Sequence, residues 1–371
     1  MAANPPPNPD RQSGRATRTH GGVIAGYVLR LIREQLELTQ EGLAECFSLS
    51  ADTIAGWETG RRSLTAVPVG QMLIHRHRLL HRGATPQLLA TLDRAIEADV
   101  LLASALEEHR SHAHPLGAWV LQRDLADFLT WPLHGRSPAA LSGLPAPPRP
   151  RRGPVPAAPE LSADDRQLFF ARIRSTAENA RTPDHFLLRR QALYLAGYDK
   201  AADTGAWVDH QQAVVRPEGW LDQWLNARSV ASVAARQGDR DQITAFVRTA
   251  LVDDERGEAA NLNYWAYWIG EIPDAELDDA FMGTRRPDSW HGRRLLQHVA
   301  DRLDPTFGYL ELYIHTLWAL IAVRPHLLRD GSVDRALLRE RVEILLDGRE
   351  ISAQADRELS DVRYALRLAE A

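Results

Sequence analysis

The sequence contains very little cysteine and no long apolar run. Cys46 is its one cysteine, which excludes an internal disulfide framework and a cysteine-based zinc ribbon, and indicates a reducing compartment. The longest apolar stretch, Leu310–Val323, is interrupted by Glu311, His315 and Thr316, so no segment reaches the ~18 apolar residues typical of a membrane helix. The first residues also lack the apolar core of a signal peptide. We therefore expect a cytoplasmic protein with no membrane contact.

Signatures of catalysis and cofactor binding are missing as well. The sequence has no GxxxxGK[ST], GxGxxG, GxSxG or HExxH motif. His77 and His81 lie four residues apart and could share a helix face, but Arg76, Arg78 and Arg82 surround them with positive charge that disfavours a metal ion. We expect no metal, no cofactor and no enzymatic activity, although an unrecognised enzyme within residues 161–371 stays a third alternative.

The charge is divided unevenly along the chain. Residues 1–152 hold 17 arginines against 14 acidic residues, a net charge of +3. Residues 153–371 hold 27 basic against 35 acidic residues, a net charge of −8. This division favours an N-terminal module that faces nucleic acid and a separate acidic body.

Proline and the spacing of apolar residues indicate how the chain is divided. Eight prolines between residues 138 and 159 favour an extended spacer and mark the clearest domain boundary. Two helices, Pro86–Arg110 and Leu116–Leu129, are expected before it. The predicted segments are a disordered basic and proline-rich arm (1–20), a compact helical domain (21–82), a helical connector that could form a dimer contact (86–136), the linker (137–160) and a helical sensor or interaction domain (161–371).

The segment 161–371 is expected to be helical throughout. Apolar residues recur there at steps of three and four, and proline and glycine separate the runs. No convincing strand pattern with hairpin turns is present. The stretch Ala234–Leu251 looks like half of a tetratricopeptide repeat, but its spacing does not recur at a fixed period. The prediction is an all-α protein whose C-terminal domain is an irregular, α-solenoid-like array.

The most informative segment is Ala25–Leu64. Its apolar spacing predicts three helices, Gly26–Leu36, Gln40–Phe47 and Ala51–Glu58. Thr39 and Ser50 suit the N-caps of the second and third helices. The last two helices are joined by a turn of three residues, an arrangement that can place the second of them in the major groove of DNA.

This segment resembles the Cro and phage-repressor type of helix-turn-helix, also called XRE, and the chain looks like an actinobacterial regulator of that type. The resemblance spans 26–69 and is carried by Thr39-Gln40, Leu43-Ala44, Ser50, Thr53-Ile54, Trp57-Glu58 and Gly60-Arg61. It implies an N-terminal domain of four or five helices. The roles it implies are base-facing positions (Ala51, Asp52, Thr53, Gly56), phosphate contacts (Gln40, Thr59 through its amide, Arg61, Arg62) and a structural clamp (Arg33, Glu58).

Each of these residues also has an interpretation without DNA. Thr39 and Gln40 could serve only to cap a helix, and Asp52 could only favour the helix dipole. Arg61 and Arg62 could be a solvated turn. Ala51 and Gly56 cannot hydrogen-bond a base through their side chains, so minor-groove contacts from the arm, through Arg11, Arg15 and Arg18, could supplement the contacts of the helix. The arm could equally be a plain tail.

Aromatic residues are concentrated in the C-terminal segment, which holds seven of the ten tryptophans. Tyr264 and Trp268 form a pair four residues apart on a predicted helix. Such stripes are usually helix-packing core. The alternative is a pocket for a peptide or a small aromatic effector, with Asn263, Tyr264, Trp265 and Trp268 as its first candidates.

The sequence therefore predicts a transcriptional regulator that binds double-stranded DNA in a sequence-specific way. Because one helix-turn-helix buries little surface, a homodimer on two half-sites is expected. The C-terminal domain would sense a ligand or bind a partner. The alternative function is a helical interaction scaffold in which the helix-turn-helix acts as a tether or a protein-binding fold.

Overall fold

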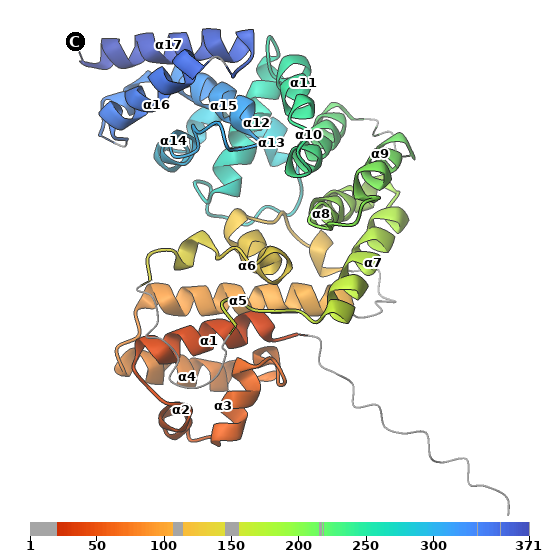
Figure 1. Ribbon diagram of the computed structural model, residues 1–371, viewed down its shortest axis with the longest axis vertical. Coiled ribbons are helices and arrows are strands. Elements are labelled where there is room, and N and C mark those ends of the chain that lie inside the picture. Colours follow the sequence, from red (N-terminus) through yellow and green to blue (C-terminus); the bar gives the residue numbers. More distant parts are fainter. Residues whose placement is uncertain are drawn as a thin grey trace, which may run out of the picture.

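The computed structural model describes residues 21–106, 114–144, 156–214, 217, 219–331, 333–348 and 350–370. Within these ranges the chain forms helices and no strand, which confirms the prediction of an all-α protein (Figure 1). The α-helices are α1 (Val23–Gln35), α2 (Gln40–Phe47), α3 (Ala51–Glu58), α4 (Val69–His81), α5 (Pro86–Leu106), α6 (Arg123–His134), α7 (Ala163–Asn179), α8 (Phe186–Ala196), α9 (Thr204–Val214), α10 (Trp220–Arg236), α11 (Asp241–Ala250), α12 (Glu255–Trp268), α13 (Phe281–Thr284), α14 (Arg293–Ala300), α15 (Leu310–Val323), α16 (Arg335–Gly348) and α17 (Ala353–Glu370).

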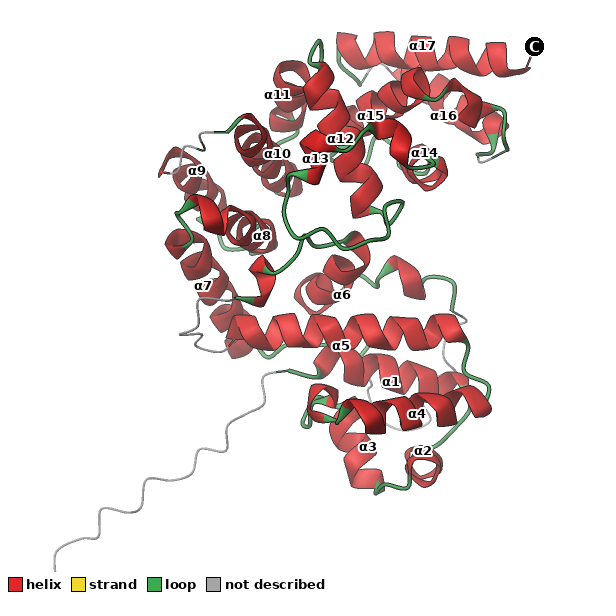
Figure 2. Cartoon of the chain, turned by 180° about the vertical axis from the view of Figure 1, so that it is seen from behind, coloured by secondary structure: helices red, strands yellow, loops and turns green. Residues whose placement is uncertain are grey.

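The helices follow one another along an elongated molecule. Helices α1–α5 form one end, α14–α17 form the other, and α6 lies between them (Figures 1 and 2). None of the described helices combines the length and the apolar character needed to cross a bilayer. The predicted arm, with Arg11, Arg15 and Arg18, lies outside the described residues.

The buried apolar residues form two large clusters. One joins α1–α8 and the other joins α10–α17. Phe169 and Ile173 of α7 are fully buried in the first cluster, so this core includes helices on both sides of the proline-rich segment. Residues 145–155 of that segment lie outside the described residues. The division of the chain into domains stays a prediction, to which the packing adds that α7 and α8 share a core with α1–α6.

Helix α5 is the central element of the first core. It packs against α1, α6 and α7. Its Asp99 is fully buried and accepts hydrogen bonds from the backbone amides of Ile24 at 3.1 Å and Ala25 at 2.7 Å. Gly22, which precedes α1, provides no side-chain cap. The carboxylate of α5 therefore satisfies the free amides at the start of α1 and faces the positive end of its dipole.

The helix expected over Leu116–Leu129 begins later than predicted. A short 3₁₀ turn occupies Pro115–Gly117, and α6 starts only at Arg123. The reason is Gln191 of α8, whose side chain accepts from the Leu121 amide at 2.6 Å and donates to the Trp119 carbonyl at 3.0 Å. These distant hydrogen bonds replace those of a helical turn, so the backbone groups remain satisfied.

We predict that Asp99 gives the protein a distinct pH dependence. Burial raises the pKa of Asp99 to about 7, well above its unfolded value of about 3.9. The folded state therefore favours the protonated carboxyl. Its contribution to stability is fully present below the unfolded pKa and is lost as pH rises through about 7, by up to about 1.4 kcal/mol per pH unit.

Chemical denaturation of the wild type and the Asp99→Asn variant at several pH values measures this contribution. Asparagine keeps an oxygen acceptor for the α1 amides but carries no charge. The stability of the wild type relative to the variant should fall steadily from about pH 5 to about pH 8. A difference that stays constant over this range would contradict the prediction.

Candidate functional site

Helices α2 and α3 have the bounds that the sequence predicts, because their caps are local. The Thr39 hydroxyl accepts from the Gly42 amide at 3.0 Å, and the Ser50 hydroxyl accepts from the Thr53 amide at 3.2 Å. Ser48 has φ 58, a left-handed conformation that ends α2 abruptly. The result is two helices joined by a turn of three residues.

Helix α3 is held against α1 by a close backbone contact and by a carboxylate. A Cβ atom on Gly26 would lie 2.0 Å from the Trp57 carbonyl oxygen, so only glycine permits this crossing. Arg33 Nε and Glu58 Oε1 are 2.6 Å apart, and Gln40 Nε2 donates to Glu58 Oε2 at 2.7 Å. The pair expected between Arg33 and Glu58 is thus formed. Gln40, expected at a phosphate, is instead engaged by the same carboxylate.

The exposed side of α3 carries a small ionic cluster that the sequence did not reveal. Arg61 Nη2 lies 2.6 Å from Asp52 Oδ1, and Arg62 Nη2 lies 3.1 Å from Asp52 Oδ2. Arg61 holds the pKa of Asp52 below its usual value, chiefly through this hydrogen bond. All three side chains are about half exposed or more (57%, 49% and 61% for Arg61, Arg62 and Asp52). A predicted base contact and two predicted phosphate contacts therefore pair with one another in the isolated chain.

Two of the expected DNA contacts need correction. Gly56 is buried, because the Arg62 side chain covers it, with Cδ 3.1 Å from where a Cβ would stand. The Thr59 amide donates to the Ala55 carbonyl at 3.1 Å and so completes α3, which leaves it unsuited to a phosphate. Of the other base-facing candidates, Ala51 is partly exposed, and the Thr53 hydroxyl accepts from Arg62 Nη1 at 3.1 Å.

The charge around this surface is mixed. Glu41 and Glu45 of α2 are exposed, as is Asp52 at the start of α3. The basic groups beside them are Arg61 and Arg62 after α3 and Arg78 of α4, whose Nη1 donates to the Cys46 carbonyl at the end of α2 at 3.0 Å. A bound polyanion would therefore meet exposed carboxylates as well as these three arginines.

The histidines of α4 have different surroundings. His75 is buried and stacks on Phe47, with ring centroids 4.2 Å apart. The Nε2 atoms of His77 and His81 are 3.0 Å apart on the exposed face. Within the described residues, no three histidine, cysteine or acidic side chains are placed to hold a metal ion.

The aromatic candidates of the C-terminal half lie at a cavity of about 160 Å³. Tyr264, Trp265 and Trp268 of α12 line it, as the sequence suggested. Asn263 does not. Its amide donates to the carbonyls of Met282 and Arg285, and its oxygen accepts from Trp290 Nε1 at 3.0 Å, so it is buried structural support.

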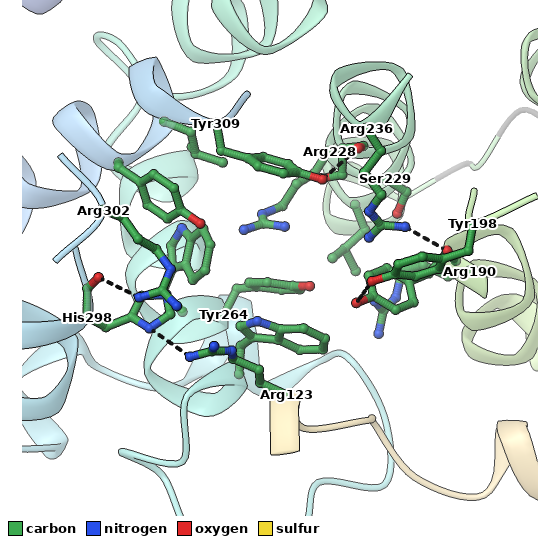
Figure 3. Close-up of a pocket in the computed structure, with 17 residues that line it drawn as sticks. Arg123, Arg190, Tyr198, Arg228, Ser229, Arg236, Tyr264, His298, Arg302 and Tyr309 are labelled. Atoms are coloured by element: carbon green, nitrogen blue, oxygen red, sulfur yellow. Dashed lines mark hydrogen bonds between the residues drawn. The ribbon is translucent and has the colours of Figure 1, made fainter. Parts of the chain in front are cut away.

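Arginine and tyrosine dominate the walls of this cavity, and sequence analysis did not identify them (Figure 3). No sequence pattern marks these arginines as one site, because the five of them are spread over four separate parts of the chain. They come from α6, α8, α10 and the segment after α14. They are Arg123, Arg190, Arg228, Arg236 and Arg302, and the five tyrosines are Tyr194, Tyr198, Tyr264, Tyr309 and Tyr313.

His298 of α14 completes this wall. Its Nδ1 atom lies 3.3 Å from Arg123 Nη1, which makes Nδ1 the acceptor. Burial, together with Arg302 and Arg123, lowers the pKa of His298 to about 2. The ring is therefore neutral and carries its proton on Nε2.

No family model, no curated protein and no solved structure matches this chain.

Proposed function

We propose that this chain is a cytoplasmic transcriptional regulator that binds double-stranded DNA, with α3 as the recognition helix of an XRE-type helix-turn-helix. The helix would enter the major groove, where Asp52 could accept from a cytosine amino group and Ala51 could contact a thymine methyl. Arg61 and Arg62 would contact phosphates on either side. The C-terminal helices, with the α10–α11 pair resembling half of a tetratricopeptide repeat, would form the sensor.

The observation that supports this proposal most is the presentation of α3. Its inner face is fixed to α1 through Trp57 and Glu58, while its N-terminal turn and the arginines that follow it remain exposed. A recognition helix needs this combination, because groove contacts require rigid placement and accessible side chains.

A homodimer on two half-sites is part of the proposal, and the packing changes where its contact is expected. Helix α5, the first candidate, is covered by α1, α6 and α7. Helix α4, which contacts α2, instead exposes Val69, Leu73 and Leu80 along one face. A second copy of the chain would cover this stripe, because exposed apolar patches favour association.

The second candidate function is a helical interaction scaffold that binds proteins through the same surface. The mixed charge of the α2–α3 surface supports this function. Asp52 partly neutralises Arg61 and Arg62, and Glu41 and Glu45 are exposed nearby. A protein partner accommodates such a surface more readily than a uniformly negative duplex does.

Removing the Arg61 charge distinguishes the two candidates. We expect Arg61→Gln to weaken binding to all duplexes and to reduce the slope of log K against log salt by about one, because one phosphate contact is lost. Fluorescence anisotropy with genomic fragments across a salt series measures both effects. Arg286→Gln is the matched control, since it removes an equal charge from a side chain that is 82% exposed and pairs with Asp288. Equal behaviour of the two variants would favour the scaffold.

Replacing Asp52 tests whether it competes with DNA for the arginines. In Asp52→Asn, Arg61 and Arg62 lose their carboxylate partner, so affinity for unrelated duplexes should rise by up to about fivefold, while preference among sequences should weaken. Glu97→Gln, which removes an exposed carboxylate paired with Arg94 on α5, is the control. Weaker binding to every duplex would show that Asp52 instead holds the arginines in a productive position.

The dimer contact is tested by a charge on the α4 stripe. Leu73 is 59% exposed, so Leu73→Glu should leave the fold intact, yet it would place a carboxylate inside the contact. We expect the wild type to sediment as a dimer and the variant as a monomer that binds half-sites independently. A variant that remains dimeric would exclude this face.

A further inference from the structure

The lining of the C-terminal cavity contains buried donors that lack acceptors. Arg228 is 6% exposed, and its Nε and Nη2 atoms have no hydrogen-bond partner. The same holds for Trp265 Nε1 and for His298 Nε2. Figure 3 shows the Arg228 guanidinium pointing into the cavity between Tyr264 and Tyr309. Buried donors are rarely left unpaired, so these groups indicate an occupant that accepts hydrogen bonds.

The charges of the lining also indicate an anionic occupant. Arg190 is neutralised by Asp279, with Nη2 2.6 Å from Oδ1, and Arg123 lies near Asp127, with Nε 3.4 Å from Oδ2. The other three arginines form no ion pair among the described residues. Arg236 donates to the Tyr194 carbonyl at 2.9 Å, and Arg302 donates to the His298 carbonyl at 3.1 Å.

Three guanidinium groups of this lining thus lack a direct ion pair, although Asp301 and Asp127 lie close enough to Arg302 to favour its charged form. Burial lowers the pKa of Arg228 and of Arg302, whereas the burial of Arg236 is outweighed by the tyrosines around it, which raise its pKa. The Arg228 guanidinium carbon lies 3.5 Å from the centroid of the Tyr264 ring, a cation–π contact that offsets part of this cost. A bound anion would offset the rest of the free-energy cost of burying the Arg228 charge. A dianion suits Arg228 and Arg302 together better than a single carboxylate does.

Size and wall chemistry restrict the anion further. The cavity measures about 160 Å³, close to the ~150 Å³ of an apolar cavity that holds one benzene molecule. It therefore admits one phosphoryl group with a small substituent and excludes a folded peptide. The Tyr264, Trp265 and Trp268 rings provide flat walls for a ring on that substituent.

We propose that this cavity binds a small phosphate monoester, with the phosphoryl group held by Arg228 and Arg302 and a ring on its ester side packed on the α12 aromatics. The site needs no DNA contact, so it stands independently of the function proposed for α3.

Calorimetric titration of the full chain with phenyl phosphate tests the site. We expect saturable binding at one site per chain, weaker binding of inorganic phosphate and of benzoate, and none of phenol. Arg228→Gln and Arg302→Gln should each lower the affinity for phenyl phosphate by about tenfold or more, since each variant loses charge-assisted hydrogen bonds to the phosphoryl group. Arg286→Gln, which removes the same charge from an exposed surface pair, should bind as the wild type does.

Each variant is compared with the wild type only where its circular dichroism spectrum shows the same fold. The second arginine variant keeps the test decisive where the first does not fold. Absence of saturable phenyl phosphate binding would overturn the proposal. So would equal affinity for benzoate, or equal loss in Arg286→Gln. Inorganic phosphate binding as tightly as phenyl phosphate would overturn the place assigned to the ring.

Discussion

The N-terminal half of the molecule depends on one buried carboxyl group. Asp99 of α5 binds the first amides of α1, and α1 in turn carries α3. Gly26 lies one residue beyond these amides and permits the close contact with Trp57. A shift of α1 along its axis would therefore disturb the α3 crossing as well as the cap. The position of the proposed recognition helix is fixed from the inside of the protein, through a buried carboxyl group that none of the proposed DNA-contacting residues touches.

The arginines of the two proposed sites have opposite surroundings. Arg61 and Arg62 are exposed and share the carboxylate of Asp52 in high-dielectric surroundings, so their pairing is weak and exchangeable. Arg228 is buried, lacks a carboxylate, and rests on an aromatic ring. An unpaired charge is costly in a low-dielectric interior. The first arrangement suits reversible contact with a large polyanion, and the second suits capture of a small one.

The sequence predicted those parts whose determinants are local. The bounds of α2 and α3 follow from Thr39 and Ser50, which act within three residues, and the all-α class follows from periodicity. The predicted start of α6 was wrong because the Gln191 side chain, 70 residues away in the chain, accepts a hydrogen bond from the Leu121 amide. The aromatics of α12 could be found because they are neighbours in the chain. The arginines that face them could not, since folding brings them from positions as far apart as Arg123 and Arg302.

The cavity also lies where the two cores meet. Arg123 belongs to α6, which packs on α5, whereas Arg228 and Arg302 come from the C-terminal half. Tyr267 donates to the Val120 carbonyl at 2.6 Å, and Gln122 donates to the Ile272 carbonyl at 3.1 Å, so the segment before α6 is already tied to the C-terminal half. An anion among these arginines would remove repulsion across this boundary without needing α6 to move. Its first effect would be to stabilise one arrangement of the two halves, and any influence on α3 would reach it through α1, which both α5 and α6 contact.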